Sequence, residues 1–244
     1  MSDAIDFIKM IGLLLWAAFH IMIFFIGLFF LPFFIWKHYD DQKKRSAEMA
    51  SMARKLGMRM DRPLDRGMDK VHRFLRKVKG SRRYALNVIS GQCQGHSVTL
   101  FEYHYQRYFN CKSYQFDQYI EHNYLSYFVL DLEKEHPGIS VKEERPASKI
   151  LARIADAIGK GDIDFESHEF SEKYDVRGNK RFAYDFCNTK MMEYLLARTS
   201  VPIEVEKAAL AIYYPEGIRQ ADIKPRLEHL VNIRERMPDY LFAG

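Results

Sequence analysis

The sequence contains few cysteines, glycines and prolines, and it lacks the short motifs that mark common enzyme sites. Its 244 residues include 3 Cys, 13 Gly and 8 Pro, which excludes a disulfide-stapled scaffold, a collagen-like chain and a low-complexity chain. It has no Gly-rich dinucleotide-binding or phosphate-binding loop and no Gly-x-Ser-x-Gly elbow of a hydrolase. What remains is a chain in which 48% of the residues are hydrophobic, enough to build a folded core.

Charged residues are absent from one long segment near the N-terminus. From Met10 to Trp36 the chain carries no charge and a single polar side chain, His20. A helix of that length reaches roughly 40 Å, which is enough to cross a hydrocarbon core of about 30 Å. The apolar region of a cleaved signal peptide is shorter, about 7–15 residues, and follows a basic front end. The segment therefore predicts one transmembrane helix over about residues 10–36.

Basic residues follow the apolar segment far more often than they precede it. Lys9 stands alone before the segment, whereas six Lys and Arg residues lie between positions 37 and 55. Because an excess of Lys and Arg marks the cytoplasmic side, we expect a single-pass protein of the cell (inner) membrane with its N-terminus outside. The side chains expected to contact the bilayer are Trp16, Trp36, Lys37, Lys43, Lys44 and Arg45.

The net charge of +5 is unevenly distributed along the chain. Residues 37–83 contain 16 basic and 6 acidic residues, whereas residues 84–244 carry a net charge of −4. Apolar residues at three- and four-residue steps predict helices over 46–56 and 64–78. Each Lys or Arg beside anionic lipid headgroups gains about 1 kcal/mol, so lipid binding is one interpretation of this segment. The other is a solvated basic face that only sets topology. Nucleic-acid binding is not expected, because the distal part of the chain is acidic.

From residue 83 onward, apolar residues alternate as strands require, and turn residues separate them. Residues 84–89 and 96–105 read as a hairpin, and a second hairpin turns near 110–113 and returns to Leu132. The remainder reads as a turn at 135–138, helices over 146–159, 180–186 and 190–197, a hairpin over 201–214 and a last helix beginning at Asp222. Asn179 and Thr189 are the predicted N-caps of the helices over 180–186 and 190–197, and Ser167 is the predicted cap of a single-turn helix that reaches Tyr174.

This order of elements predicts an α+β fold, with an antiparallel, Tyr-rich sheet flanked by helices after a single N-terminal transmembrane helix. We expect a membrane anchor at 1–39, a basic juxtamembrane helical neck at 40–82 and a cytoplasmic α+β domain at 83–244.

Five short blocks of the sequence occur in a recognisable order. They are Leu56-Gly57-Met58, residues 87–91 (NVISG), residues 98–105 (VTLFEYHY), residues 161–167 (GDIDFES) and residues 170–178. These blocks resemble those of a family of membrane-anchored bacterial and archaeal proteins with no established activity. The resemblance covers roughly residues 50–240 and implies a tethered soluble domain, without implying catalytic residues.

Three histidines on the predicted strands are the candidate metal ligands. His96, His104 and His122 lie on adjacent strands, and a turn near residues 112–113 would bring His104 roughly opposite His122. The chain has no Cys-x-x-Cys and no helical His-x-x-x-His pattern. We therefore expect surface or half-buried histidines, with no metal, no cofactor and no identifiable catalytic residue.

Tyrosines are concentrated in the predicted sheet, where 8 of the 15 lie between positions 84 and 127. Tyr103, Tyr105 and Tyr114 are the candidate partner-binding residues, because tyrosine is enriched at protein interfaces; filling of the core is the alternative. The resulting hypothesis is a non-enzymatic binding or scaffolding module that meets a protein partner at the inner leaflet. An apolar-ligand-binding domain and a membrane-associated enzyme with an unidentified site are the alternatives.

Overall fold

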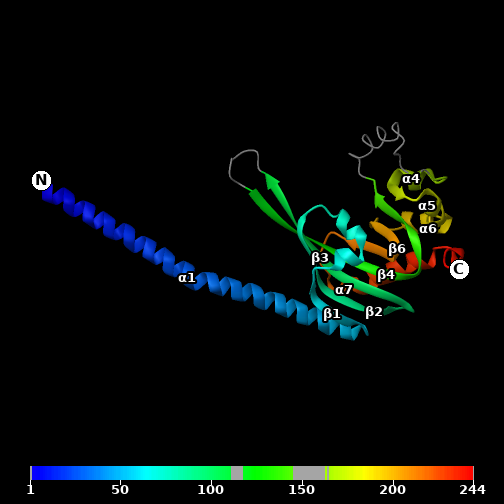
Figure 1. The fold of residues 1–244 in the computed structure, drawn as a ribbon, viewed down its shortest axis with the longest axis horizontal. Helices are drawn as coiled ribbons and strands as arrows, with labels where there is room; N and C mark the ends of the chain where they lie inside the picture. The colour runs from blue at the N-terminus through cyan, green and yellow to red at the C-terminus, as the bar shows by residue number, and fades with distance from the viewer. Residues whose placement is uncertain (1, 111–117, 145–162, 164, 244) are drawn as a thin grey trace. The chain divides into compact units, whose positions relative to one another are not determined.

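The computed structural model describes residues 2–110, 118–144, 163 and 165–243, and the chain forms two compact units, Met1–Glu48 and Met49–Gly244. The helix α1 (Ser2–Lys55) accounts for the first unit and enters the second. It contains the apolar stretch Met10–Phe34, which by length and composition is long enough to cross a membrane. The predicted helices over 10–36 and 46–56 are therefore both present, joined in one continuous helix (Figure 1).

The second unit is built on a six-stranded sheet in which every described pairing is antiparallel. The first four strands are neighbours in chain order, and the last two both pair with β4. This arrangement confirms the predicted α+β fold with an antiparallel sheet. The strands are β1 (Arg59–Asp65), β2 (Ser81–Cys93), β3 (His96–Asn110), β4 (Gln118–Glu143), β5 (Tyr174–Gly178) and β6 (Ile203–Tyr214).

Helices cover both faces of the sheet, and each face has its own hydrophobic cluster. The larger cluster joins the sheet to α5, α6, α7 and residues 49–53 of α1. The smaller cluster lies under α2 and η1 and contains Phe101 and Tyr127. The helices that follow α1 among the described residues are α2 (Met68–Val71), η1 (Arg73–Lys77), α4 (His168–Lys173), α5 (Lys180–Phe186), α6 (Thr189–Leu196), α7 (Gln220–Glu235) and η2 (Asp239–Leu241).

Local sequence signals account for several element boundaries. The β2–β3 hairpin turns at Gln94 and Gly95, which both have positive φ, as a two-residue turn of this kind requires. The Ser167 and Asn179 side chains accept hydrogen bonds from the backbone of α4 and α5, which confirms both predicted caps. The cap of α6 is Asn188, one residue before the predicted Thr189.

The helix predicted over 64–78 is wrong. Leu64 lies in β1, which pairs with β2, and the rest of the segment forms the short helices α2 and η1. The buried residues there are Met68, Phe74 and Leu75, a set that does not follow one helical stripe. The helical neck expected at 40–82 therefore contains a strand, because pairing with β2 satisfies the backbone that a helix would have satisfied internally.

Two reversals predicted in the sheet are also wrong. Residues 135–138 lie inside the continuous strand β4, and the hairpin expected over 201–214 is the single strand β6. Both strands carry an irregularity at the same place, where His136 pairs with Lys207, and Lys207 has φ +54°. Because the two strands deform together, their pairing continues through this site. The sequence of either strand, taken by itself, would predict a turn there. The helix predicted over 146–159 lies outside the described residues.

Candidate binding surface and buried ion networks

The predicted partner-binding tyrosines do not form an exposed surface. Tyr103 is 1% exposed and Tyr105 5% exposed. Tyr103 packs edge-on against Tyr127 in the cluster under α2 and η1, and burial raises the pKa of Tyr103 to about 12, although Arg83 opposes the shift. Neither side chain offers area to a partner. Tyr114 lies outside the described residues.

The exposed aromatic surface lies farther out, on a part of the β3–β4 hairpin that extends past the sheet. We call residues 107–110 of β3 and 118–125 of β4 the hairpin arm (Figure 1). Tyr108 (51% exposed) stands directly opposite Ile120 (43%), and Tyr124 (37%) lies four residues farther along β4, on the same face. The arm therefore presents three large apolar side chains on one face.

Both edges of the hairpin arm lack a neighbouring strand among the described residues. On one side, β2 pairs with β3 no farther than Gln106. On the other, β6 pairs with β4 from Ser126 onward. An unpaired strand edge offers backbone donors and acceptors to another chain. The arm thus combines an apolar face with backbone groups available for pairing.

Two of the three candidate metal ligands, His104 and His122, form a histidine pair. The Nε2 atom of His104 lies 3.0 Å from Nδ1 of His122, and the other ring nitrogen of His104 donates to the Arg82 carbonyl. The register places Gln106, not His104, opposite His122, so the two rings meet diagonally. His96 begins β3, opposite Cys93. Within the described ranges, no three His, Cys, Asp or Glu residues are grouped to hold a metal ion.

Burial shifts the acid–base chemistry of His104. It lowers the pKa of His104, which also stacks on Tyr84 with ring centroids 4.4 Å apart, and the neighbouring His122 lowers that pKa further. The Arg82 carbonyl opposes the shift by accepting a hydrogen bond from the ring. A neutral His104 donates at one nitrogen and accepts at the other, so the pair fixes the tautomer at the base of the arm.

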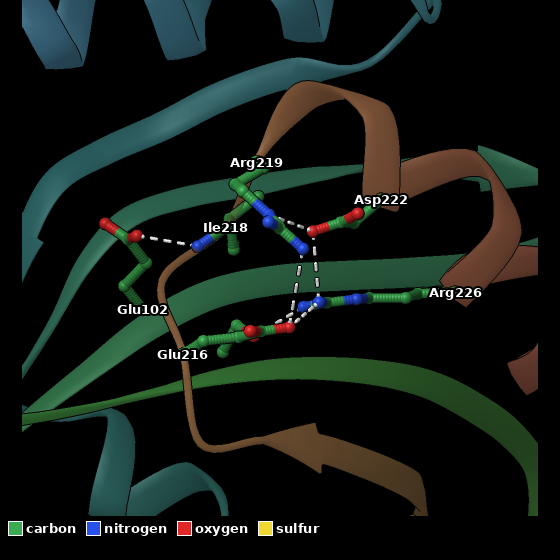
Figure 2. Close-up of polar contacts among 7 residues, drawn as sticks. Glu102, Glu216, Ile218, Arg219, Asp222 and Arg226 are labelled. Carbon is green, nitrogen blue, oxygen red and sulfur yellow. Dashed lines mark hydrogen bonds and ion pairs between the residues drawn. The ribbon is translucent and has the colours of Figure 1, made fainter. Parts of the chain in front are cut away.

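A buried carboxylate lies on the same face of the sheet as the histidine pair, closer to the centre of the sheet. Glu102 is buried and accepts a hydrogen bond from the backbone N–H of Ile218 at 2.9 Å (Figure 2). Its second carboxylate oxygen accepts a hydrogen bond from Asn87 Nδ2 at 3.0 Å. Asn87 occupies a bulge of β2 with φ +52°, a conformation that asparagine tolerates better than most residues. The burial of this acid was not predicted from the sequence, although its position in line with Leu100 on an alternating strand was a usable signal.

A second network connects α7 to the sheet through Arg226. This buried guanidinium donates to Ser126 Oγ at 3.0 Å and to Asp222 Oδ2 at 3.1 Å, and it forms an ion pair with Glu216 (Figure 2). It also lies 3.9 Å from the ring centroid of Tyr214. Together with Arg219, which binds Asp222 at 2.7 Å, two cations face two carboxylates. The two positive and two negative charges of this network cancel. The network holds the β6–α7 connection against β4.

A third network lies on the opposite face of the sheet. The buried Glu204 binds Lys77 at 2.9 Å, Lys142 at 2.8 Å and Ser140 Oγ at 3.0 Å. Burial opposes protonation of Lys142, but the charge of Glu204 and its hydrogen bond outweigh this, so the pKa of Lys142 is raised. Since Lys77 belongs to η1, the network fastens η1 to β4 and β6.

The predicted membrane-contacting residues all lie on α1 and are exposed. Trp16 and Trp36 are among its exposed large side chains, and the four basic residues from Lys37 to Arg45 are exposed as well. The one polar side chain of the apolar stretch, His20, donates from Nδ1 to the Trp16 carbonyl one turn earlier, at 2.8 Å. This contact pairs one of the two imidazole nitrogens within its own helix.

Comparison with known proteins reveals a likeness of fold. No family model matches the chain, and no curated protein matches it. Among solved structures, the crystal structure of the mycobacterial trehalose monomycolate transport factor A, TtfA, is similar to it, with a TM-score of 0.50 and 12% sequence identity. The match covers 79% of this chain and 96% of that chain. At that identity the likeness concerns the fold alone.

Proposed function

We propose that this chain is a single-pass, membrane-anchored binding or scaffolding module that works without catalysis at the cytoplasmic face of the cell membrane. In this proposal α1 crosses the bilayer between Met10 and Phe34, with the N-terminus outside. The excess of basic residues after that stretch supports the orientation. Residues 37–45 then lie beside the anionic headgroups of the inner leaflet, with Trp36 at the interface.

The hairpin arm is the observation that carries this proposal. Exposed Tyr108, Ile120 and Tyr124 on one face, together with two unpaired strand edges, suit a protein partner that adds a strand and buries these side chains. Aromatic anchors of this kind dominate the binding energy of many interfaces. This contact surface differs from Tyr103 and Tyr105 of the predicted one, which lie closer to the centre of the sheet.

The experiment that tests the arm is site-specific photo-crosslinking in native membranes. A photoreactive amino acid at position 120 should give one discrete adduct of the full chain, and the same residue at the exposed Tyr240 should not. The double substitution Tyr108→Ser/Tyr124→Ser should abolish the adduct. Its matched control is Tyr184→Ser, an exposed tyrosine of α5.

Three outcomes would overturn the arm as a partner site. They are equal crosslinking from positions 120 and 240, an adduct that survives Tyr108→Ser/Tyr124→Ser, and an adduct at twice the 28.9 kDa mass of the chain. The last would identify a second copy as the occupant. The orientation has its own test, because a reporter fused after Gly244 should be active in the cytoplasm, and periplasmic activity would reverse the topology.

A role as an accessory factor in transport is a second candidate. It is favoured by one observation, the fold shared with a protein described as a transport factor. The same crosslinking tests it, since this role requires the adduct from position 120 to contain a component of a transporter. The two alternatives from the sequence, an apolar-ligand-binding domain and a membrane-associated enzyme, stay predictions.

A further inference from the structure

A basic surface with an exposed valine covers the outer side of α2 and η1. Residues 66–83 contain eight Lys and Arg and one acid, Asp69. Val71 is 70% exposed and lies between the exposed side chains of Lys70 and Arg73. We call Arg66, Lys70, Val71 and Arg73 the lid surface. It is separate from the hairpin arm in sequence and lies outside the strands that form the arm.

The outward position of Val71 is fixed by the fold. Its neighbours Met68, Phe74 and Leu75 are buried in the cluster with Phe101. Lys77 of η1 is held by the buried carboxylate of Glu204 at 2.9 Å. Burial on one side of α2 and η1 therefore leaves Lys70, Val71 and Arg73 on the other, and an exposed valine at this site is a stable feature of the folded domain.

The positive charge of the lid surface is not neutralised within the described part of the chain. The carboxylate of Asp69 lies 4.0 Å from Arg83, and the carboxylate of Glu204 forms an ion pair with Lys77. Arg66, Lys70 and Arg73 form no ion pair with a described residue. Clustered cations around an exposed aliphatic side chain complement an anionic bilayer interface, where the cations meet headgroups and the aliphatic group leaves water.

We infer that the lid surface docks on anionic phospholipid headgroups of the membrane that anchors the chain, with Val71 entering the interface. This inference rests on the membrane anchoring of the proposed function but not on the hairpin arm. Anchoring makes the contact intramolecular, so weak binding by a few cations is enough to populate the docked state. Docking at a second point restricts the orientation of the domain on the bilayer.

The test places a polarity-sensitive fluorophore on the lid surface of the full chain in vesicles. Val71→Cys is labelled in a background in which Cys93 and Cys111 are serine and Cys187 is alanine. In vesicles of phosphatidylcholine mixed with phosphatidylglycerol, the emission of the label should shift to shorter wavelength. In vesicles of pure phosphatidylcholine it should not shift. At about 1 M salt, where the Debye length is about 3 Å, the shift should disappear.

Charge reversal supplies the matched control. The double substitution Lys70→Glu/Arg73→Glu should lower the ratio of docked to undocked chains more than about tenfold. Lys180→Glu/Lys190→Glu makes the same change in net charge at two exposed lysines of α5 and α6 and should leave the ratio unchanged. A label at Tyr240→Cys should stay in water in both kinds of vesicle.

A second readout needs no substitution, because amide exchange in residues 66–82 of the natural chain should slow in anionic vesicles relative to neutral ones. A chain that floats with both kinds of vesicle, but shows neither the blue shift nor the slowed exchange, overturns the inference and leaves the anchor intact. Equal effects of the two double substitutions would also overturn it. A chain that does not float with vesicles would instead contradict the membrane anchoring.

Discussion

The backbone N–H of Ile218 donates to the buried carboxylate of Glu102 at 2.9 Å, although 116 residues separate them in the chain. The second carboxylate oxygen accepts from Asn87 Nδ2. One acid on β3 therefore fixes both a bulge of β2 and the segment that leads into α7. The larger hydrophobic cluster depends on that segment, since α7 contributes Leu227, Leu230 and Val231 to it.

Replacement of this carboxylate should destabilise the domain. Glu102→Gln keeps the shape of the side chain but turns one acceptor oxygen into an NH₂ group that faces a donor. Hydrogen bonds to charged groups contribute about 1.5–3 kcal/mol, so we expect a loss of about 2 kcal/mol. Urea unfolding of the full chain in detergent micelles, followed by near-ultraviolet circular dichroism of the tyrosines, measures it. Glu193→Gln, at an exposed acid of α6, should change the unfolding free energy by less than about 0.5 kcal/mol.

Removal of the Glu204 charge should loosen η1 without unfolding the sheet. Lys77 and Lys142 both reach solvent, so Glu204→Gln should cost no more than about 1–2 kcal/mol. The raised pKa of Lys142 means that this stabilisation is complete at neutral pH and is lost as the pH rises through the lysine pKa. Faster amide exchange confined to residues 73–78 is the expected signature, and exchange that also rises across β4 would contradict it.

Sequence reasoning succeeded where the signal is local. The β2–β3 hairpin follows from alternating apolar residues and Gly95, and the starts of α4 and α5 follow from Ser167 and Asn179. The continuity of β4 and β6 could not be predicted, because the irregularity at His136 and that at Lys207 resemble turns until they face each other. Pairing across about 70 residues decides the outcome there.

The candidate surface was misplaced for a similar reason. Alternation correctly puts Phe101, Tyr103 and Tyr105 on one face of β3, yet it says nothing about what covers that face. The cover comes from Phe74 and Leu75, in a segment that the sequence assigned to a membrane-proximal neck. On β3 and β4, the exposed tyrosines among the described side chains are Tyr108 and Tyr124 of the hairpin arm, beyond that cover.

The end of β5 should tolerate no side chain at Gly178. Its φ is +136°, and an added Cβ would lie 2.2 Å from the backbone oxygen of Gly138, which cannot move without separating β5 from β4. We expect Gly178→Ala to cost about 3 kcal/mol of unfolding free energy. Gly95 also has positive φ but has nothing near its Cβ position, so Gly95→Ala should cost about 1–2 kcal/mol. If urea unfolding shows the same loss of unfolding free energy in both variants, the backbone around residue 178 relieves the clash with Gly138 by moving.

The buried His229 on α7 should make the domain sensitive to acid. Its Nδ1 atom lies 2.8 Å from the hydroxyl of Tyr194, and burial, followed by the charges of Arg198 and Arg236, lowers its pKa to about 4. An unfolded histidine has a pKa of about 6.5, so the unfolded chain binds this proton first as the pH falls. The stabilisation is present above pH 6.5 and is lost between about pH 6.5 and pH 4, by up to about 3 kcal/mol.

Comparison with His229→Leu isolates this contribution. The variant is less stable at pH 7, because Tyr194 loses its partner, but its unfolding free energy should fall less steeply between about pH 6.5 and pH 4. The other buried histidines are common to both chains and cancel in the difference. His168→Gln, at an exposed histidine of α4, should follow the natural chain at every pH. If the natural chain and His229→Leu lose stability with the same slope, the imidazole takes up its proton in the folded domain as readily as in the unfolded chain, and its burial has no part in the acid response.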